Sequence, residues 1–134
     1  MVESVIDILK NDDVLAALVG NNSTGEKVKI YPVIAPQKEK HPYVTVRQTG
    51  KVRQGKGCSF QGSFAVFSYA ENYDDVKEID LQVVKVMEAV NGGNNVSFVN
   101  LTGTSDDFVF QGDGGGGLYS RISTFDCTYD ESGT

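Results

Sequence analysis

The stretch IYPVIAPQ at residues 30–37, followed by HPYVTV at residues 41–46, decides how this chain is organised. Proline fixes φ and removes a backbone donor, so Pro32 predicts the end of a short strand. The polar, proline-bounded residues 36–42 predict an exposed loop. Apolar and polar residues then alternate, which predicts a longer strand over residues 43–49. The centre of the chain is therefore two strands joined by a surface loop.

The first twenty residues predict a helix, in one piece or two. Apolar residues recur at steps of three and four, which is typical of a helix with one buried face. Asn11, Asp12 or Asp13 can cap a second piece, and Gly20 is positioned as its C-terminal cap. A helix is thus expected directly before the first strand.

After the central strands, the pattern changes twice. Residues 50–57 are basic and bounded by glycine, and predict a connection; residues 59–69 then predict a strand with aromatic residues on both faces. Two apolar faces indicate a strand covered on both sides, by helices or by a neighbouring subunit. Residues 74–90 predict a long amphipathic helix with one continuous apolar stripe, capped by Asn72 or Asp74.

The last third of the chain predicts strands only. They are expected at residues 96–102, 107–111 and 118–129, with turns at 103–106 and 112–117. The fold class is therefore α+β: a mostly antiparallel sheet of five or six strands, packed by the N-terminal helix and the long central helix. We expect a single domain over residues 1–134, with residues 130–134 as a frayed tail.

Charge is distributed unevenly along the chain. The net charge of the 134 residues is −6. Residues 27–56 hold eight of the twelve basic residues and one acid, a net +7, whereas residues 57–134 hold three basic and twelve acidic residues, a net −9. Such segregation favours assembly of copies with complementary faces, and also fits a patch that touches nucleic-acid phosphate; a solvated surface without a partner is the alternative. Our hypothesis is that the basic segment of one subunit faces the acidic C-terminal half of the next.

No apolar run approaches the roughly 20 residues that cross a bilayer, so no membrane partner is expected. The N-terminal residues lack a basic region ahead of a continuous apolar one, which argues against a signal peptide. We therefore expect the protein to be made in cytoplasm.

A search for catalytic residues finds few candidates. His41 is the single histidine and precedes a proline in the expected loop, so it lacks the companions of a general base or metal ligand. The glycine-rich residues 112–117 lack the lysine–serine pair and the following helix of a phosphate loop, and predict a hairpin tip. Asp106, Asp107 and Asp113 lack calcium-loop spacing. We expect no catalytic, cofactor-binding or metal site, and hence no enzyme.

The two cysteines, Cys58 and Cys127, lie far apart and belong to no metal-spaced pair. Cys58 lies at the very start of the expected Phe-rich strand and Cys127 lies within the last one, where buried thiols that act as small apolar residues are typical. A disulfide between them is the alternative if their strands pair.

The candidate functional residues are Lys51, Arg53 and Lys56, on the glycine-flanked connection between two strands. We call this segment the basic hairpin. It is either a solvated tip, a contact for an acidic patch on a neighbouring subunit, or a contact for the backbone of passing DNA. The interleaved aromatic residues that stack single-stranded bases are missing from it.

The order and motifs of residues 1–90 resemble the tail terminator (tail-completion) proteins of long-tailed bacteriophages. The matching features are the helix that ends at Gly20, the strand end Ile30-Tyr31-Pro32, the strand start Pro42-Tyr43-Val44, and the strand of residues 64–69 that leads into a helix. The glycine-rich residues 112–117 depart from the family pattern.

The resemblance implies a virion structural protein without enzymatic activity. Members form rings, usually hexamers, that cap the major tail tube protein, end its polymerisation, and join the head through a head-completion or neck protein. DNA passes through the ring without sequence-specific contact. The protein would then reside in the tail or neck of the virion after assembly in the cytoplasm of a bacterial host, with Lys51, Arg53 and Lys56 at a subunit interface or the lumen.

Two alternatives stay open at this stage. Another phage neck or tail-tube subunit would share the architecture. A small-molecule or carbohydrate-binding module would instead use aromatic residues such as Tyr119, Phe125 and Tyr129 to line a pocket.

Overall fold

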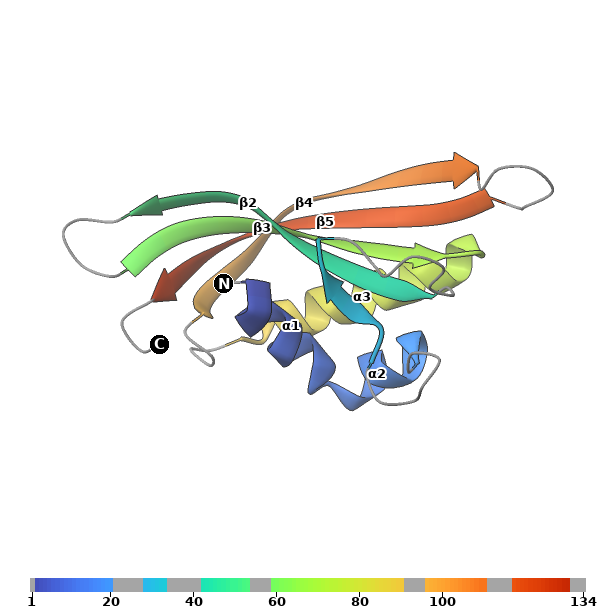
Figure 1. Cartoon of the computed structure of the whole chain (residues 1–134), viewed down its shortest axis with the longest axis horizontal. Coiled ribbons are helices and arrows are strands. Elements are labelled where there is room, and N and C mark those ends of the chain that lie inside the picture. The colour runs from blue at the N-terminus through green and yellow to red at the C-terminus, as the bar shows by residue number, and fades with distance from the viewer. Residues whose placement is uncertain are drawn as a thin grey trace.

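In the residues that it describes, the computed structural model has three helices and five strands, arranged as Figure 1 shows. It describes residues 2–20, 28–33, 42–53, 59–90, 96–110 and 117–130. The elements are α1 (Val2–Lys10), α2 (Asp13–Val19), β1 (Ile30–Pro32), β2 (Tyr43–Arg53), β3 (Ser59–Ala70), α3 (Tyr73–Glu88), β4 (Val96–Phe110) and β5 (Gly117–Asp130).

The five strands form one mixed sheet in the order β1-β2-β3-β5-β4. β1 runs parallel to β2, and the other neighbours are antiparallel. All three helices lie on one face of this twisted sheet (Figure 1). The predicted α+β class is confirmed, with a mostly antiparallel sheet of five strands.

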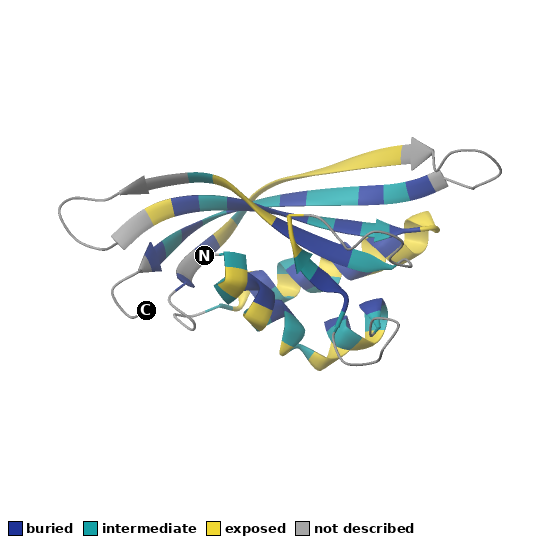
Figure 2. Cartoon of the chain, in the orientation of Figure 1, coloured by how far each residue is buried: buried dark blue, intermediate teal, exposed yellow. Residues whose placement is uncertain are grey.

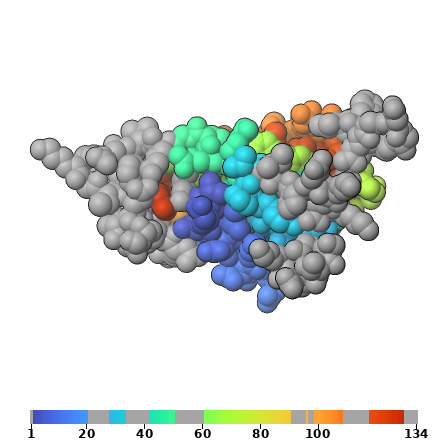
Figure 3. All heavy atoms as spheres, viewed as in Figure 1, coloured from blue at the N-terminus to red at the C-terminus, as the bar shows by residue number. Residues whose placement is uncertain are grey.

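The N-terminal helix is in two pieces because Asp12 interrupts it. The Asp12 carboxylate accepts a hydrogen bond from the backbone N–H of Leu15 at 2.9 Å, which caps α2. Gly20 ends α2 with φ at 74°, a conformation that favours glycine. Both predicted caps are confirmed. In Figure 3, atoms of α1 lie against those of β1, and α1 and α2 together cover the lower part of this side of the molecule.

The core lies between the helices and the inner face of the sheet (Figure 2). α3 contributes Val76, Ile79, Val83 and Met87, all at most 1% exposed, as its apolar stripe predicts. Opposite them, Phe64 of β3 and the ring of Phe125 of β5 stack with centroids 5.2 Å apart. Asn72 occupies the N-cap position of α3, but its side chain donates to Asp75 and makes no capping hydrogen bond.

Two predicted boundaries in the sheet are wrong. β2 continues through the expected connection as far as Arg53, with a register shift between Gln48 and Gly50. The two strands expected at 96–102 and 107–111 are one strand, β4, which also pairs through the expected turn at 103–106. The cause is the same in both: a β-bulge admits residues typical of turns without ending the strand. Asp130, expected in the frayed tail, still pairs with Ser59.

Several predicted features lie outside the described residues. These are the loop at 36–41 with His41, the basic Lys56, Cys58, and residues 112–116 of the glycine-rich turn. Predictions about them stay predictions.

Candidate functional surfaces

β2, whose last residues include Lys51 and Arg53 of the basic hairpin, ends at one end of the sheet (Figure 1). Lys51 pairs with Gly62 and Arg53 with Phe60. β1 pairs only with residues 44–46 of β2, so in the described part of the chain β2 has no strand on its other side from Arg47 onward. Lys51 and Arg53 therefore lie on a strand edge that no described strand covers. Such an edge is available for contact with another molecule.

The sheet face opposite the helices carries a line of aromatic rings. Tyr43 and Tyr69 lie with ring centroids 4.9 Å apart, and Phe67 and Tyr69 stack at 6.4 Å. The Arg47 guanidinium lies 5.1 Å from the centroid of the Phe67 ring. The prediction that the residue 59–69 strand has two apolar faces is confirmed: helices cover one, and no described element covers the other (Figure 1).

At the other end of the sheet, an open hollow of about 340 Å³ lies between α3, β4 and β5. Its lining residues, which we call the aromatic hollow, are Tyr73, Asp106, Asp107, Phe108 and Tyr119. The Tyr119 ring makes edge-on contacts to both Phe108, at 4.8 Å, and Tyr73, at 5.9 Å. Phe108 is 39% exposed and Tyr73 is 42% exposed. Large exposed rings grouped around a hollow are typical of contact surfaces.

The two carboxylates of the aromatic hollow have different surroundings. Asp106 Oδ1 lies 3.2 Å from Arg121 Nε, and Asp106 Oδ2 accepts a hydrogen bond from the Tyr73 hydroxyl at 3.4 Å. Asp107 Oδ1 accepts the backbone N–H of Phe108 at 2.8 Å. Two carboxylates against one guanidinium leave the aromatic hollow net negative.

A buried polar network lies beneath the aromatic hollow. Ser123, which is fully buried, donates its hydroxyl hydrogen bond to Asp80, which is 2% exposed. Arg121 Nε lies 3.6 Å from Asp80 Oδ2, and Thr104 shares a hydrogen bond with Ser123 at 3.2 Å. Burial raises the pKa of Asp80, against the opposing hydrogen bond from Ser123 and the charge of Arg121. The network ties α3 to β5 and β4.

Sequence reasoning missed this network, although a signal was present. Asp80 lies four residues after Val76 and three before Val83, on the apolar stripe of α3. A carboxylate at such a position must find partners inside the protein. The Ser123 hydroxyl is buried beyond the reach of a substrate, so we assign the pair a structural role.

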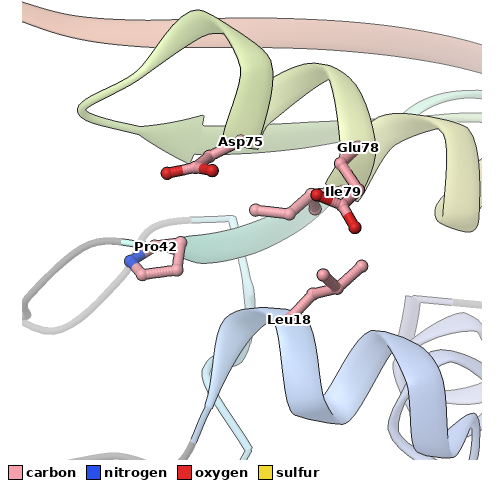
Figure 4. A pocket seen from close by; sticks show the side chains of 5 residues that line it. All are labelled: Leu18, Pro42, Asp75, Glu78 and Ile79. Carbon is pink, nitrogen blue, oxygen red and sulfur yellow. The ribbon is translucent and has the colours of Figure 1, made fainter.

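A second hollow, of about 280 Å³, lies between α2, α3 and the start of β2 (Figure 4). Leu18, Pro42 and Ile79 form its apolar walls, and the carboxylates of Asp75 and Glu78 stand at its edge. Among the described residues, no group of three or more His, Cys, Asp or Glu side chains is placed to hold a metal ion.

The predicted aromatic pocket of a binding module is wrong for two of its three residues. Phe125 is fully buried and Tyr129 is 7% exposed, and both belong to the core. They face inward because alternate residues of β5 point toward the helices. Tyr119 lies in the aromatic hollow.

Cys127 is a buried thiol in β5, as predicted. Burial, with the neighbouring charge of Asp126, raises its pKa to about 11. Its register partner in β3 is Gly62. The alternative, a disulfide with Cys58, concerns a residue outside the described part of the chain.

No helix in the described part of the chain is long and apolar enough to cross a membrane.

These surfaces define a class by architecture: an α+β domain with helices on one sheet face, an aromatic face on the other, and charged surfaces at the two sheet ends. No protein-family model and no curated protein sequence matches the chain. Among solved structures, the chain is similar to a chain in the virion of the native gene transfer agent (GTA) particle. The TM-score is 0.68 at 15% sequence identity, over 97% of this chain and 94% of the other. The likeness shows that the two chains share a fold.

Proposed function

We propose that this protein is a structural component of a phage-type virion that caps the tail tube as a ring. The observation that carries the proposal is the fold shared, over nearly the whole length of both chains, with a chain of a GTA virion. The resemblance of residues 1–90 to tail terminators supports the more specific tail-capping role. A fold alone does not define a function, so the proposal also depends on the residues at the two ends of the sheet.

The described surfaces favour assembly over chemistry. The end of β2 that carries Lys51 and Arg53 and the parts of β4 and β5 that line the aromatic hollow lie at opposite ends of one sheet. Contacts between unlike surfaces repeat from copy to copy and close a ring when the rotation allows. We propose a hexamer as the ring, the major tail tube protein below it, and a head-completion or neck protein above it. DNA would pass through the hole, contacting only its walls.

A capping assay tests the proposal directly. Tail tube protein from the same genome is polymerised with and without this protein, and tube lengths are measured by negative-stain electron microscopy. A terminator shortens the tubes in proportion to its concentration and appears at one end of each tube. Unchanged tube lengths with no end-bound density would contradict the capping role.

The nearest alternative, a tail-tube or other neck subunit, gives a different result in the same images. A tube subunit forms long tubes on its own at high concentration, or enters the tube wall along its whole length. A small-molecule-binding module leaves the tubes unchanged and stays a monomer.

A further inference from the structure

Lys51 and Arg53 lie far from the aromatic hollow of their own chain. Arg53 pairs with Phe60, which pairs with Tyr129, whereas Phe108 of the aromatic hollow pairs with Tyr119. Tyr119 and Tyr129 are ten residues apart on β5. At about 3.3 Å per strand residue, the two sites are separated by about 33 Å. Any contact between them therefore joins two copies of the chain.

The chemistry of the aromatic hollow suits a cationic side chain. Tyr73, Phe108 and Tyr119 line a space that is open to solvent, and Asp106 and Asp107 of β4 are its acidic lining residues. A guanidinium stacks on aromatic faces and pairs with a carboxylate at the same time, and a lysine ammonium is also attracted to both. Nucleic acid is disfavoured here, because phosphate and these carboxylates repel each other.

The charge of the surrounding elements reinforces this preference. Tyr73 is followed in the first turn of α3 by Asp74 and Asp75, both exposed. Arg121 is engaged with Asp80 and Asp106. A cation entering the aromatic hollow thus meets an excess of negative charge.

We infer that the aromatic hollow binds the end of β2 from a second copy of this chain, with Lys51 and Arg53 as the cationic residues of that segment. This inference rests on the proposed function, for which it supplies the subunit contact. Each copy carries one basic hairpin and one aromatic hollow at opposite ends. When two copies join, the hollow of the first and the basic hairpin of the second therefore stay available for further copies. A closed ring uses all of them.

Charge reversal on both sides tests the contact. The hairpin variant is Lys51→Glu with Arg53→Glu, and the hollow variant is Asp107→Lys, which leaves the Asp106–Arg121 pair in place. Lys85→Glu and Glu88→Lys are matched controls, since both residues are exposed on the last turns of α3. Subunit number is measured by light scattering on a sizing column, and circular dichroism checks folding.

We expect each reversal to weaken assembly by about tenfold or more, because like charges then face each other. The controls should assemble like the wild type. Mixing the two variants should restore assembly into rings with an even number of subunits, since every contact between unlike copies then joins opposite charges.

The outcomes separate this inference from the proposed function. A wild-type ring that survives both reversals overturns the inferred contact but leaves the ring proposal standing. A wild type that forms only a charge-sensitive dimer supports the contact and overturns the ring. A wild type that stays monomeric, alone and with tail tubes, overturns both.

Discussion

Two phenylalanine-to-alanine substitutions test separately the core of this protein and its proposed contact surface. Phe125 and Phe108 both lie in β-strands and both contact another aromatic ring. Phe125 is fully buried against Phe64, whereas Phe108 is 39% exposed beside Tyr119. The same chemical change is therefore made once in the core and once at the aromatic hollow.

The two substitutions are expected to lower the free energy of unfolding by amounts that differ by about threefold. Phe125→Ala removes a buried ring and leaves a cavity, which costs about 3 to 5 kcal/mol of unfolding free energy. Phe108→Ala removes an edge-on ring contact and partial burial, about 1 to 2 kcal/mol. For 134 residues, the unfolding entropy is about 0.28 kcal/mol/K. The melting temperature should therefore fall by about 11 to 18 °C for Phe125→Ala and about 4 to 7 °C for Phe108→Ala.

The assay pairs thermal unfolding with light scattering at a temperature where both variants are folded. Phe108→Ala should lose ring assembly while staying folded, because its ring borders the proposed contact. Phe125→Ala should keep assembly while it is folded. Equal losses of stability would refute the assignment of Phe108 to a surface, and intact assembly of Phe108→Ala would refute its place in the contact.

Three further predictions concern the fold. Asp12→Ala should cost about 1 to 2 kcal/mol in urea unfolding, since Asp12 caps α2 and also accepts a hydrogen bond from Gln82 at 2.8 Å; a loss below 0.3 kcal/mol, roughly the error of the method, would contradict the cap. Burial raises the folded-state pKa of Asp80, so folding binds a proton there. The stability advantage of wild type over Asp80→Asn should be largest below about pH 3.8 and should fall as pH rises through the raised pKa, measured by urea unfolding of both proteins across that range; a difference that grows with pH would contradict the burial argument. In a Cys58→Ala variant, Cys127, with its pKa of about 11, should react with a thiol reagent at pH 8 only after denaturant is added; rapid reaction of the folded protein would show an accessible thiolate.

The helices could be predicted from the sequence because their signals are local. The break at Asp12, the cap at Gly20 and the stripe from Val76 to Met87 each depend on residues within a few turns of one another. Lys51 and Arg53 could be named as candidates for the same reason, since they are neighbours along the chain, and their role stays a proposal.

The course of β4 and the aromatic hollow depend on long-range pairing, which local patterns do not contain. Gly103 is typical of a turn, yet β5 holds it in the strand opposite Thr124. The hollow brings Tyr73 and Phe108 to Tyr119 from three separate elements. Only the register of β4 on β5, and the packing of α3 against them, makes these residues neighbours.

The most direct test of the central claim is the mass of the wild-type particle in solution, measured by light scattering between about 50 and 500 mM salt, with and without tail tubes, and imaged by negative stain. We expect a discrete ring of about six subunits, alone or at tube ends, that loosens as salt screens the charged contacts. A strict monomer under every condition, with tube ends left bare, would contradict the account.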